Sequence, residues 1–500
     1  MKTTICIYGG TGAGVTAALQ AVRMGQSVVL LEPGHHVGGM NVEGLGHSDI
    51  DNHPNFKNRS SIGAMALEFY RRIGRQYGKD SEVFVFEPHV AEAVFADWLA
   101  EENVPVRLGC RLKEVYCQEN RLQSLVMENG EEFQATVFID ATIEGDLLAR
   151  AGVTTTIGRE PNARYGETKN GIRAESKHGQ FQVRVDPFRI PGDASSGVIP
   201  TIQDEPLGVP GAGDNRIQAY CFRLCLTDDP ANRVPFSKPE GYDDSHYEIY
   251  RRYVQAGGTL FKPYAQLPNR KTDLNGGHDL STNLYGLNHA YPAGDSATRE
   301  RILREHRVFT QGLCWFLAND PSMPEDVRHE WSRWGTCRDE FTDNAGWPRL
   351  FYVRDARRLV SDYVITEHHT RRLGQTPVDD PVALADWPPD THSVRRIVRD
   401  GAAYNEGFVF GGDDWAPFGV SYRALVPRRE ECLNLITPTC PSSSHAAYGA
   451  IRLEWTFMAL GQAAGTAAGL AVAESLAVQD VSYPRLRDLL QSAGQILSRR

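Results

Sequence analysis

Thr3-Thr4-Ile5-Cys6-Ile7-Tyr8-Gly9-Gly10-Thr11-Gly12-Ala13-Gly14 is the stretch that decides the fold of this 500-residue chain. The β-branched run before the glycines predicts a strand, and the small apolar residues 15–24 after them predict a helix. Residues 27–31 predict a second strand, which ends in Glu32. A strand, a glycine-rich turn, a helix and a strand ending in an acid are typical of a dinucleotide-binding unit, because glycine lets the backbone approach a pyrophosphate and the acid meets a ribose.

The turn departs at one position from the usual spacing of its three glycines. Gly9 and Gly14 stand at the first and third positions, whereas Thr11 stands where the second glycine is expected. A lone glycine-rich turn is weak support, since glycine also marks ordinary turns. The flanking strands, the helix and the terminal acid all fall within about 30 residues, and this context predicts dinucleotide binding.

Length and composition restrict the classes of protein that this chain can belong to. Five hundred residues predict two or more domains. A net charge of −10 without a basic stripe gives no reason to expect nucleic acid as a partner. Nine scattered cysteines, an odd number, argue against a disulfide scaffold and favour a reducing compartment, so we expect a cytoplasmic protein.

One apolar stretch, residues 446–476, raises the question of a membrane helix. It contains Arg452, Glu454 and Gln462 together with many small residues, so a buried helix is favoured over a membrane span. The first strand begins at residue 3, which leaves no room before it for a signal peptide. We therefore expect no association with a membrane.

The rest of the chain predicts one nucleotide-binding domain in two parts. Helices are expected over 62–77 and 90–102, a strand over 104–108, a β-meander over 111–134 and a buried strand over 136–140. Residues 151–425 lack a second glycine-rich unit, and helices are expected there over 299–319, 325–334 and 350–373. The predicted division is 1–150 for the first part of the nucleotide-binding domain, 151–425 for an inserted mixed α+β substrate or cap domain, 426–475 for the second part and 476–500 for a C-terminal surface helix.

Several motifs spread over most of the chain together resemble one family. They are Gly9-Gly10-Thr11-Gly12-Ala13-Gly14, Glu32-Pro33, Gly38-Gly39-Met40, 138–142 with Gly145-Asp146, 350–358, 422–427 and 440–465. The chain resembles the bacterial FAD-dependent oxidoreductases whose first motif is Gly-Gly-Thr-x-Ala-Gly, a branch of the glutathione-reductase-like FAD-binding Rossmann superfamily. In that branch threonine is normal at the second glycine position. The resemblance implies an α/β fold, with an FAD-binding Rossmann-like domain that contains a β-meander.

Two departures from the family pattern touch the edge of the expected active site. Relatives often have Gly-Asp-Gly-Asp where this chain has Ile143-Glu144-Gly145-Asp146, and Asp355 replaces the glutamate of an Arg-Glu-Ala-Arg-Arg pattern. Neither departure affects the expected binding of FAD.

The resemblance implies which residues contact the cofactor. Gly9, Thr11, Gly12, Ala13 and Gly14 would hold the pyrophosphate, and Glu32 would bind the adenosine ribose. Further contacts are implied for Gly38, Gly39, Met40, Ala141, Thr142, Thr439 and Cys440. The N-terminus of a helix that begins near 446–450 would face the pyrimidine side of the flavin and stabilise negative charge there. The alternative for residues 33–40 is an ordinary flexible loop.

Three residues are candidates for catalysis. His445, at the turn before the long apolar stretch, could transfer the proton that hydride removal requires, or it could only cap the helix or contact the cofactor. Arg452 lies seven residues further on and could bind an anionic substrate or pair with a core carboxylate. Arg354 is another anion-binding candidate, unless it only belongs to a solvated or paired face.

Two further groups are considered against simpler alternatives. Cys440 could be redox-active or a covalent tether to the flavin, but without a C-x-x-C partner an inert buried thiol is favoured. His35, His36, His47 and Asp51 could be assembled into a metal site, which their irregular spacing supports only weakly. We therefore predict no metal.

The predicted function is removal of a hydride from a small polar organic substrate by a dehydrogenase or oxidase that uses FAD. Oxygen or a separate electron acceptor would reoxidise the flavin. The alternatives are a desaturase or aromatising dehydrogenase of a biosynthetic intermediate, and a flavin-binding protein without catalysis. Substrate, acceptor, covalent attachment of FAD and homo-oligomerisation are left open.

Overall fold

The structure is a computed structural model and describes residues 1–54, 56–277, 279–412 and 414–499. Its central sheet has five parallel strands in the order β21-β7-β1-β2-β3. The strands are β1 (Ile5–Tyr8), β2 (Val28–Leu31), β3 (Val106–Arg107), β7 (Val137–Asp140) and β21 (Leu435–Ile436). Strands β1, β2, β7 and β21 are buried along their whole length, as expected for a parallel sheet that is covered on both faces. The sheet confirms the α/β Rossmann-like fold.

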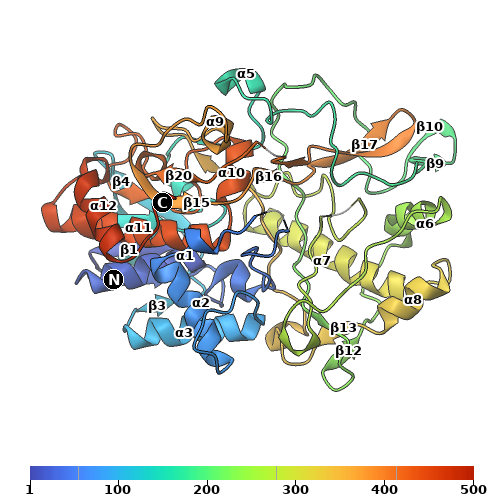
Figure 1. Cartoon of the computed structure of the whole chain (residues 1–500), viewed down its shortest axis with the longest axis horizontal. Coiled ribbons are helices and arrows are strands. Elements are labelled where there is room, and N and C mark those ends of the chain that lie inside the picture. The colour runs from blue at the N-terminus through green and yellow to red at the C-terminus, as the bar shows by residue number, and fades with distance from the viewer. Residues whose placement is uncertain (55, 278, 413, 500) are drawn as a thin grey trace.

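Helix α1 (Gly12–Arg23) follows β1, as predicted, and packs along α11 (Glu454–Glu474), which comes from the other end of the chain. The two backbones approach closely at glycines. A Cβ atom on Gly461 would lie 2.1 Å from the carbonyl oxygen of Ala13, and one on Gly465 would lie 2.5 Å from that of Ala17. Figure 1 shows the blue N-terminal and red C-terminal segments side by side in the left half of the molecule.

Helices α2 (Ala64–Gln76) and α3 (Pro88–Glu101) lie close to their predicted positions. The predicted meander is also present, as the antiparallel sheet of β4 (Leu112–Gln118), β5 (Arg121–Met127) and β6 (Glu132–Gln134). The hairpin between β5 and β6 closes at Gly130, whose φ of 88° suits glycine.

The remaining elements are short, with the exception of one long helix. The helices are α4 (Asp146–Arg150), α5 (Asn162–Tyr165), α6 (Glu248–Gln255), α7 (Ser296–Asn319), α8 (Glu325–Ser332), α9 (Glu367–Thr370), α10 (His445–Ile451) and α12 (Tyr483–Ser492). The strands up to residue 337 are β8 (Thr155–Thr156), β9 (Phe188–Ile190), β10 (Asp193–Val198), β11 (Leu226–Thr227), β12 (Arg233–Pro235) and β13 (Gly335–Cys337). The later strands are β14 (Arg358–Leu359), β15 (Pro381–Ala385), β16 (Asp390–Thr391), β17 (Arg395–Arg399), β18 (Ala402–Glu406), β19 (Val409–Phe410) and β20 (Phe418–Ser421).

Two helix predictions were wrong. Residues 350–373 form no long helix: they contain β14 and α9 within irregular backbone. The reason is that Arg354 and Arg358 do not lie on a helix surface but are fully buried, with carbonyl oxygens of distant segments as partners. The stretch 446–476 is two helices, because Leu453 between α10 and α11 is extended (φ −80°, ψ 140°).

Two large hydrophobic cores lie on the two sides of the molecule. The first surrounds α1, α2, α3 and α11, and it also includes apolar residues within the ranges 382–385 and 418–426. The second surrounds α6, α7 and α8 at the right of Figure 1. Residues 382–385 and 418–426 therefore pack with the nucleotide-binding part, although they precede the predicted boundary at 426.

Helix α11 is long and apolar enough to cross a membrane by length and composition alone. However, 83% of its most apolar segment is buried inside the protein, against α1 and the sheet. It is therefore a core helix of this fold.

Candidate active site

Thr11 closes the glycine-rich turn with its side chain. Its hydroxyl accepts a hydrogen bond from the N–H of Gly14 at 3.2 Å, which makes Thr11 the N-cap of α1. The same hydroxyl donates to the carbonyl oxygen of Ala141 at 2.8 Å. Thr11 thus joins the turn after β1 to the end of β7, a connection that a glycine could not make.

The glycines on either side of Thr11 leave no room for side chains. A Cβ atom on Gly14 would lie 2.0 Å from the carbonyl oxygen of Gly9, and one on Gly9 would lie 2.6 Å from the backbone of Ala141. Gly38, with a φ of 130°, lies against the side chains of Val42 and Phe95 in the same way. The backbone at these glycines therefore packs directly against neighbouring parts of the chain, where any side chain would displace it.

Glu32 ends β2, and backbone N–H groups hold its carboxyl group in place. The N–H of Gly10 donates to Oε2 at 2.7 Å and the N–H of Gly34 to Oε1 at 2.6 Å. Burial raises the pKa of Glu32 to about 7, although these two hydrogen bonds lower it. The carboxyl group thus lies next to the glycine-rich turn, where the ribose of a dinucleotide is expected.

A cavity of about 770 Å³ connects these features with a polar region further along. At one end it is lined by Glu32 and His35, in the middle by Gly9, Thr11 and Thr142, and at the other end by a larger set of residues. That set consists of Met40, Tyr352, Arg354, Tyr448, Arg452, Glu454 and Phe457. The cavity thus joins Glu32 and the glycine-rich turn, the two features that a dinucleotide contacts.

The break between α10 and α11 decides which predicted residues face the cavity. Arg452 and Glu454, on either side of the break, line it, and the first turn of α11 lies beside them. The helix N-terminus at the cavity is therefore that of α11 at Glu454 and not the predicted one near 446–450. His445 does not line the cavity: it is 1% exposed, and its Nδ1 lies 3.1 Å from Oδ2 of Asp355.

Glu454 and Asn41 form a polar pair over the start of α1, and neither was predicted as a site residue. The amide of Asn41 donates to Oε2 of Glu454 at 3.0 Å, and both side chains lie within 4 Å of the place where a Cβ on Gly12 would be. Burial raises the pKa of Glu454 to about 8, and the hydrogen bond from Asn41 lowers it. Among the described residues, the buried Oδ1 of Asn41 has no hydrogen-bond partner, so it is a free acceptor beside the turn.

Tyr352 is a further cavity residue without a predicted role. Its hydroxyl accepts a hydrogen bond from Nη1 of Arg452 at 2.6 Å. Arg354 and Arg223 stand over the same ring, with their guanidinium carbons 5.1 and 5.5 Å from its centroid. Tyr352 lies in the block 350–358 that carries the family resemblance, and three arginines, Arg223, Arg354 and Arg452, surround its ring.

Cys440 and Thr439 lie behind the cavity wall. The hydroxyl of Thr439 donates to the carbonyl oxygen of Thr142 at 2.6 Å, and Sγ of Cys440 lies 3.4 Å from the same oxygen. The thiol is fully buried and does not line the cavity, and burial raises its pKa well above the usual value. These surroundings are those of an unreactive structural thiol.

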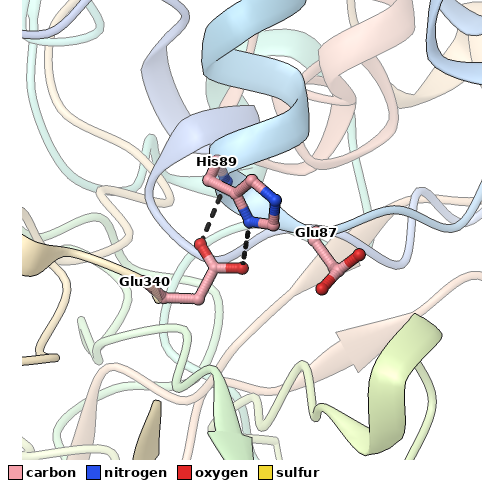
Figure 2. A group of neighbouring side chains, drawn as sticks. All are labelled: Glu87, His89 and Glu340. Carbon is pink, nitrogen blue, oxygen red and sulfur yellow. Dashed lines mark hydrogen bonds and ion pairs between the residues drawn. The ribbon is translucent and has the colours of Figure 1, made fainter. Parts of the chain in front are cut away.

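One cluster of side chains has the composition of a metal site. Figure 2 shows Glu87, His89 and Glu340 pointing toward one another, with Nδ1 of His89 2.7 Å from Oε1 of Glu340. The ammonium group of Lys271 lies 2.7 Å from each of the two glutamates and already supplies a cation there. His35, His36, His47 and Asp51 do not form a comparable group in the part of the chain that the structure describes.

The parallel sheet, the capped glycine-rich turn and the long cavity define a dinucleotide-binding protein. The chain belongs to the FAD-dependent oxidoreductase family, whose model ("FAD dependent oxidoreductase") matches residues 4–490. It is therefore an enzyme with FAD as its cofactor. No curated protein sequence matches the chain.

Several solved structures match a part of the chain. One is a flavin-containing monooxygenase from Stenotrophomonas maltophilia, with 20% identity, a TM-score of 0.20, and coverage of 28% of this chain and 38% of that chain. Another is the thioredoxin reductase of T. acidophilum, with 19% identity, a TM-score of 0.19, and coverage of 28% and 35%. The chain thus spans about a third of the length of these two structures, and such matches say nothing about its substrate or electron acceptor.

The residues of the cavity fit FAD. The glycine contacts keep side chains away from the turn, and the unpartnered Oδ1 of Asn41 offers an acceptor beside it. Met40, Thr142 and Glu454 line the cavity as well, whereas Ala13, Ala141, Thr439 and Cys440 are buried outside its lining.

Proposed function

We propose that this protein oxidises a small polar organic substrate by transferring a hydride to FAD, as a dehydrogenase or an oxidase. The observation that carries the proposal is the polar part of the cavity, where Tyr352 and Arg452 meet at the N-terminus of α11. FAD, when bound, supplies the two-electron acceptor. The substrate would lie at this end, away from Glu32.

The chain's own residues have separate tasks in this proposal. Gly9, Thr11 and Gly14 bind the pyrophosphate, and Glu32 orients the adenosine ribose. The first turn of α11 stabilises negative charge at the flavin end of the cavity through its helix dipole. Arg354 and Arg452 favour an anionic group in the same place.

His445 has a positioning role in the proposal. His445 begins α10, its Nδ1 lies 3.1 Å from Oδ2 of Asp355, and its backbone N–H donates to Oε2 of Glu160 at 3.0 Å. Asp355 in turn accepts from the N–H of Gln218 at 2.9 Å. His445 thus fixes the segment that carries Arg354 against the segment that leads to Arg452. To act as a proton acceptor, as the sequence suggested, His445 would need a path for the proton from the cavity to its buried ring.

Oxygen or a separate acceptor is proposed as the oxidant of the reduced cofactor. Beyond residue 150, the glycine pairs Gly257-Gly258, Gly276-Gly277 and Gly411-Gly412 are the candidates for a second nucleotide-binding turn, and within the described residues none leads into a helix. A site for NAD(P)H therefore has no support from the fold.

The experiment is anaerobic reduction of the purified yellow protein. A panel of alcohols, amines and hydroxy acids is mixed with the enzyme, and loss of the flavin absorbance near the visible maximum is followed. At least one substrate is expected to bleach the flavin, whereas NADH bleaches it slowly or not at all. Rapid stoichiometric reduction by NADH would contradict the proposal, and a product two hydrogens lighter without a new carbonyl would favour the desaturase alternative.

The same proposal includes the division of the chain. Residues 1–150 and 426–475 bind the cofactor, 151–425 supply the substrate side, and 476–500 cover the surface with α12. We also propose a cytoplasmic location, in keeping with nine free cysteines, eight of them buried. Association into a homo-oligomer stays a prediction.

A further inference from the structure

We propose that Tyr352 and Arg452 form a carboxylate-binding site, so that the substrate is an organic acid. This inference rests on the proposed function, because it identifies the class of molecule that the oxidation would use. The site lies at the end of the cavity opposite Glu32. Its two ligand-facing side chains come from segments 100 residues apart in the sequence, joined by the 2.6 Å hydrogen bond between them.

Tyr352 has a proton available for a ligand. Its hydroxyl accepts from Nη1 of Arg452, and no acceptor for its own proton is present among the described residues. The side chain lines the cavity and is 8% exposed. Burial raises the pKa of Tyr352, although the three arginines lower it, so the phenol is a neutral hydrogen-bond donor.

Arg452 is held in place by its neighbours and brings a positive charge next to the hydroxyl of Tyr352. Nη1 donates to Tyr352, and Nη2 donates to the carbonyl oxygen of Asp390 at 3.0 Å. The buried Nε has no partner among the described residues. The nearest carboxylate, that of Asp390, is 3.7 Å away. Burial raises the pKa of this carboxyl group, which weakens the electrostatic attraction between Asp390 and Arg452.

Arg354 supplies a second positive charge directly behind Tyr352. Its guanidinium is fully buried, and within the described residues no carboxylate lies within ion-pair distance of it. Its partners are the sulfur of Cys221 and neutral oxygens, which belong to Ala219, Asn275, Gly276 and Asn283. A buried charge without a counter-ion is costly, and an anion bound at Tyr352 would offset that cost.

The neighbouring groups at this end of the cavity are less suited to bind a carboxylate. Arg223 is neutralised by Asp273, with Nη2 2.5 Å from Oδ2. The hydroxyl of Tyr448 donates to the carbonyl oxygen of Thr439 at 3.0 Å. Tyr352, with Arg452 directly beside its hydroxyl, is therefore the donor at this place that a carboxylate would use.

The test is a titration of the FAD-loaded protein with benzoate, with benzamide as the neutral molecule of the same shape. Binding is read from the change in the visible flavin spectrum, without any turnover. Benzoate is expected to shift the spectrum saturably, and benzamide is expected to bind at least about tenfold more weakly, because charge-assisted hydrogen bonds are the stronger ones. Equal binding of the two probes, or no binding of benzoate, would overturn the inference.

Variants locate the binding site. Tyr352→Phe is expected to weaken benzoate by about 10-fold, from the loss of the donor hydroxyl, and Arg452→Met by about 100-fold, from the loss of the positive charge beside that hydroxyl. Arg301→Met removes the same charge from the exposed surface and is expected to leave benzoate binding unchanged. FAD content and thermal midpoint are measured for each variant. Arg452→Met removes the arginine that is paired with Asp390. If this variant does not fold, the benzoate affinity of Tyr352→Phe alone tests the inference.

One result would assign these residues to the cofactor instead. If Tyr352→Phe alters the flavin spectrum without ligand but leaves benzoate affinity as in the wild type, the donor pair contacts the flavin and the inference is wrong. The proposed oxidation can be wrong while the carboxylate site is right. Benzoate then binds as expected, but no acid, alcohol or amine reduces the flavin.

Discussion

Replacing Thr11 tests whether the glycine-rich turn depends on a hydroxyl. In Thr11→Val the side chain keeps its shape but loses the hydrogen bonds to the N–H of Gly14 and to the carbonyl of Ala141. Loss of the helix N-cap costs about 1 kcal/mol. Loss of the hydrogen bond to Ala141 costs about 1 kcal/mol more. The total of about 2 kcal/mol corresponds to about a 30-fold weaker complex with FAD, if the bound state requires the closed turn.

The assay is quenching of FAD fluorescence on titration with apoprotein, supported by thermal melts with and without FAD. Thr11→Ser keeps the hydroxyl and is the matched control, with binding close to that of the wild type. Thr11→Gly restores the common three-glycine pattern and loses only a few tenths of a kcal/mol at the cap. It still loses the bond to Ala141, so its affinity is expected between those of serine and valine.

Either of two outcomes would refute this reasoning. One is wild-type affinity in Thr11→Val, which would show that the two hydrogen bonds do not contribute. The other is tighter binding by Thr11→Gly than by the wild type, which would show that threonine is only a tolerated replacement for glycine.

Three other perturbations probe the packing and charges around the site. Gly461→Ala places a Cβ atom 2.1 Å from the carbonyl oxygen of Ala13, so it should lower the free energy of unfolding by about 1–3 kcal/mol and reduce FAD content. Gly469→Ala is the control, because its Cβ meets only a flexible side chain and should cost less stability. Equal thermal midpoints of the two variants would contradict this expectation. Burial raises the pKa of Glu454 to about 8, so between about pH 5 and about pH 8 the folded state holds a proton that the unfolded state releases. The stability of the wild type relative to Glu454→Gln should therefore fall as pH rises from about 5 to about 8. A difference in melting temperature between the two proteins that does not vary with pH would disprove the shift. Lys271→Met leaves buried carboxylates without their cation, so it should lower the free energy of unfolding by about 3–5 kcal/mol. Thermal or urea unfolding measures this loss, and a value below about 1 kcal/mol would argue against the ion cluster.

The elements that local sequence determines were predicted well. Strand β1, helix α1 and strand β2 follow from β-branched runs, a glycine turn and small residues at helical spacing, and the meander β4–β6 follows from alternation and the Asn129-Gly130 turn. These signals lie within a few residues of the structure that they specify. The parallel sheet is thereby defined, although β21 joins it from a position about 300 residues after β7 in sequence.

The predictions that failed concern segments whose partners are far away. The stretch 350–373 has the composition of a helix, but Arg354 and Arg358 are stabilised by carbonyl groups of other segments, and that requirement overrides helical propensity. The break at Leu453 is also invisible in the sequence, because no proline or glycine marks it. It turns Arg452 and Glu454 toward the cavity and leaves His445 behind it.

The sequence by itself determined the class of fold, the family and the cofactor, because the glycine-rich turn, its threonine cap and its terminal acid act locally on the backbone. Only the tertiary structure decided which side chains share the far end of the cavity. Tyr352 and Arg452 meet there, and Glu454 meets Asn41 beside the glycine-rich turn, since the chain returns to α1 more than 400 residues after leaving it and packs α11 against it through glycines. Contacts of that range depend on burial and on the pairing of buried charges, and no local pattern encodes them.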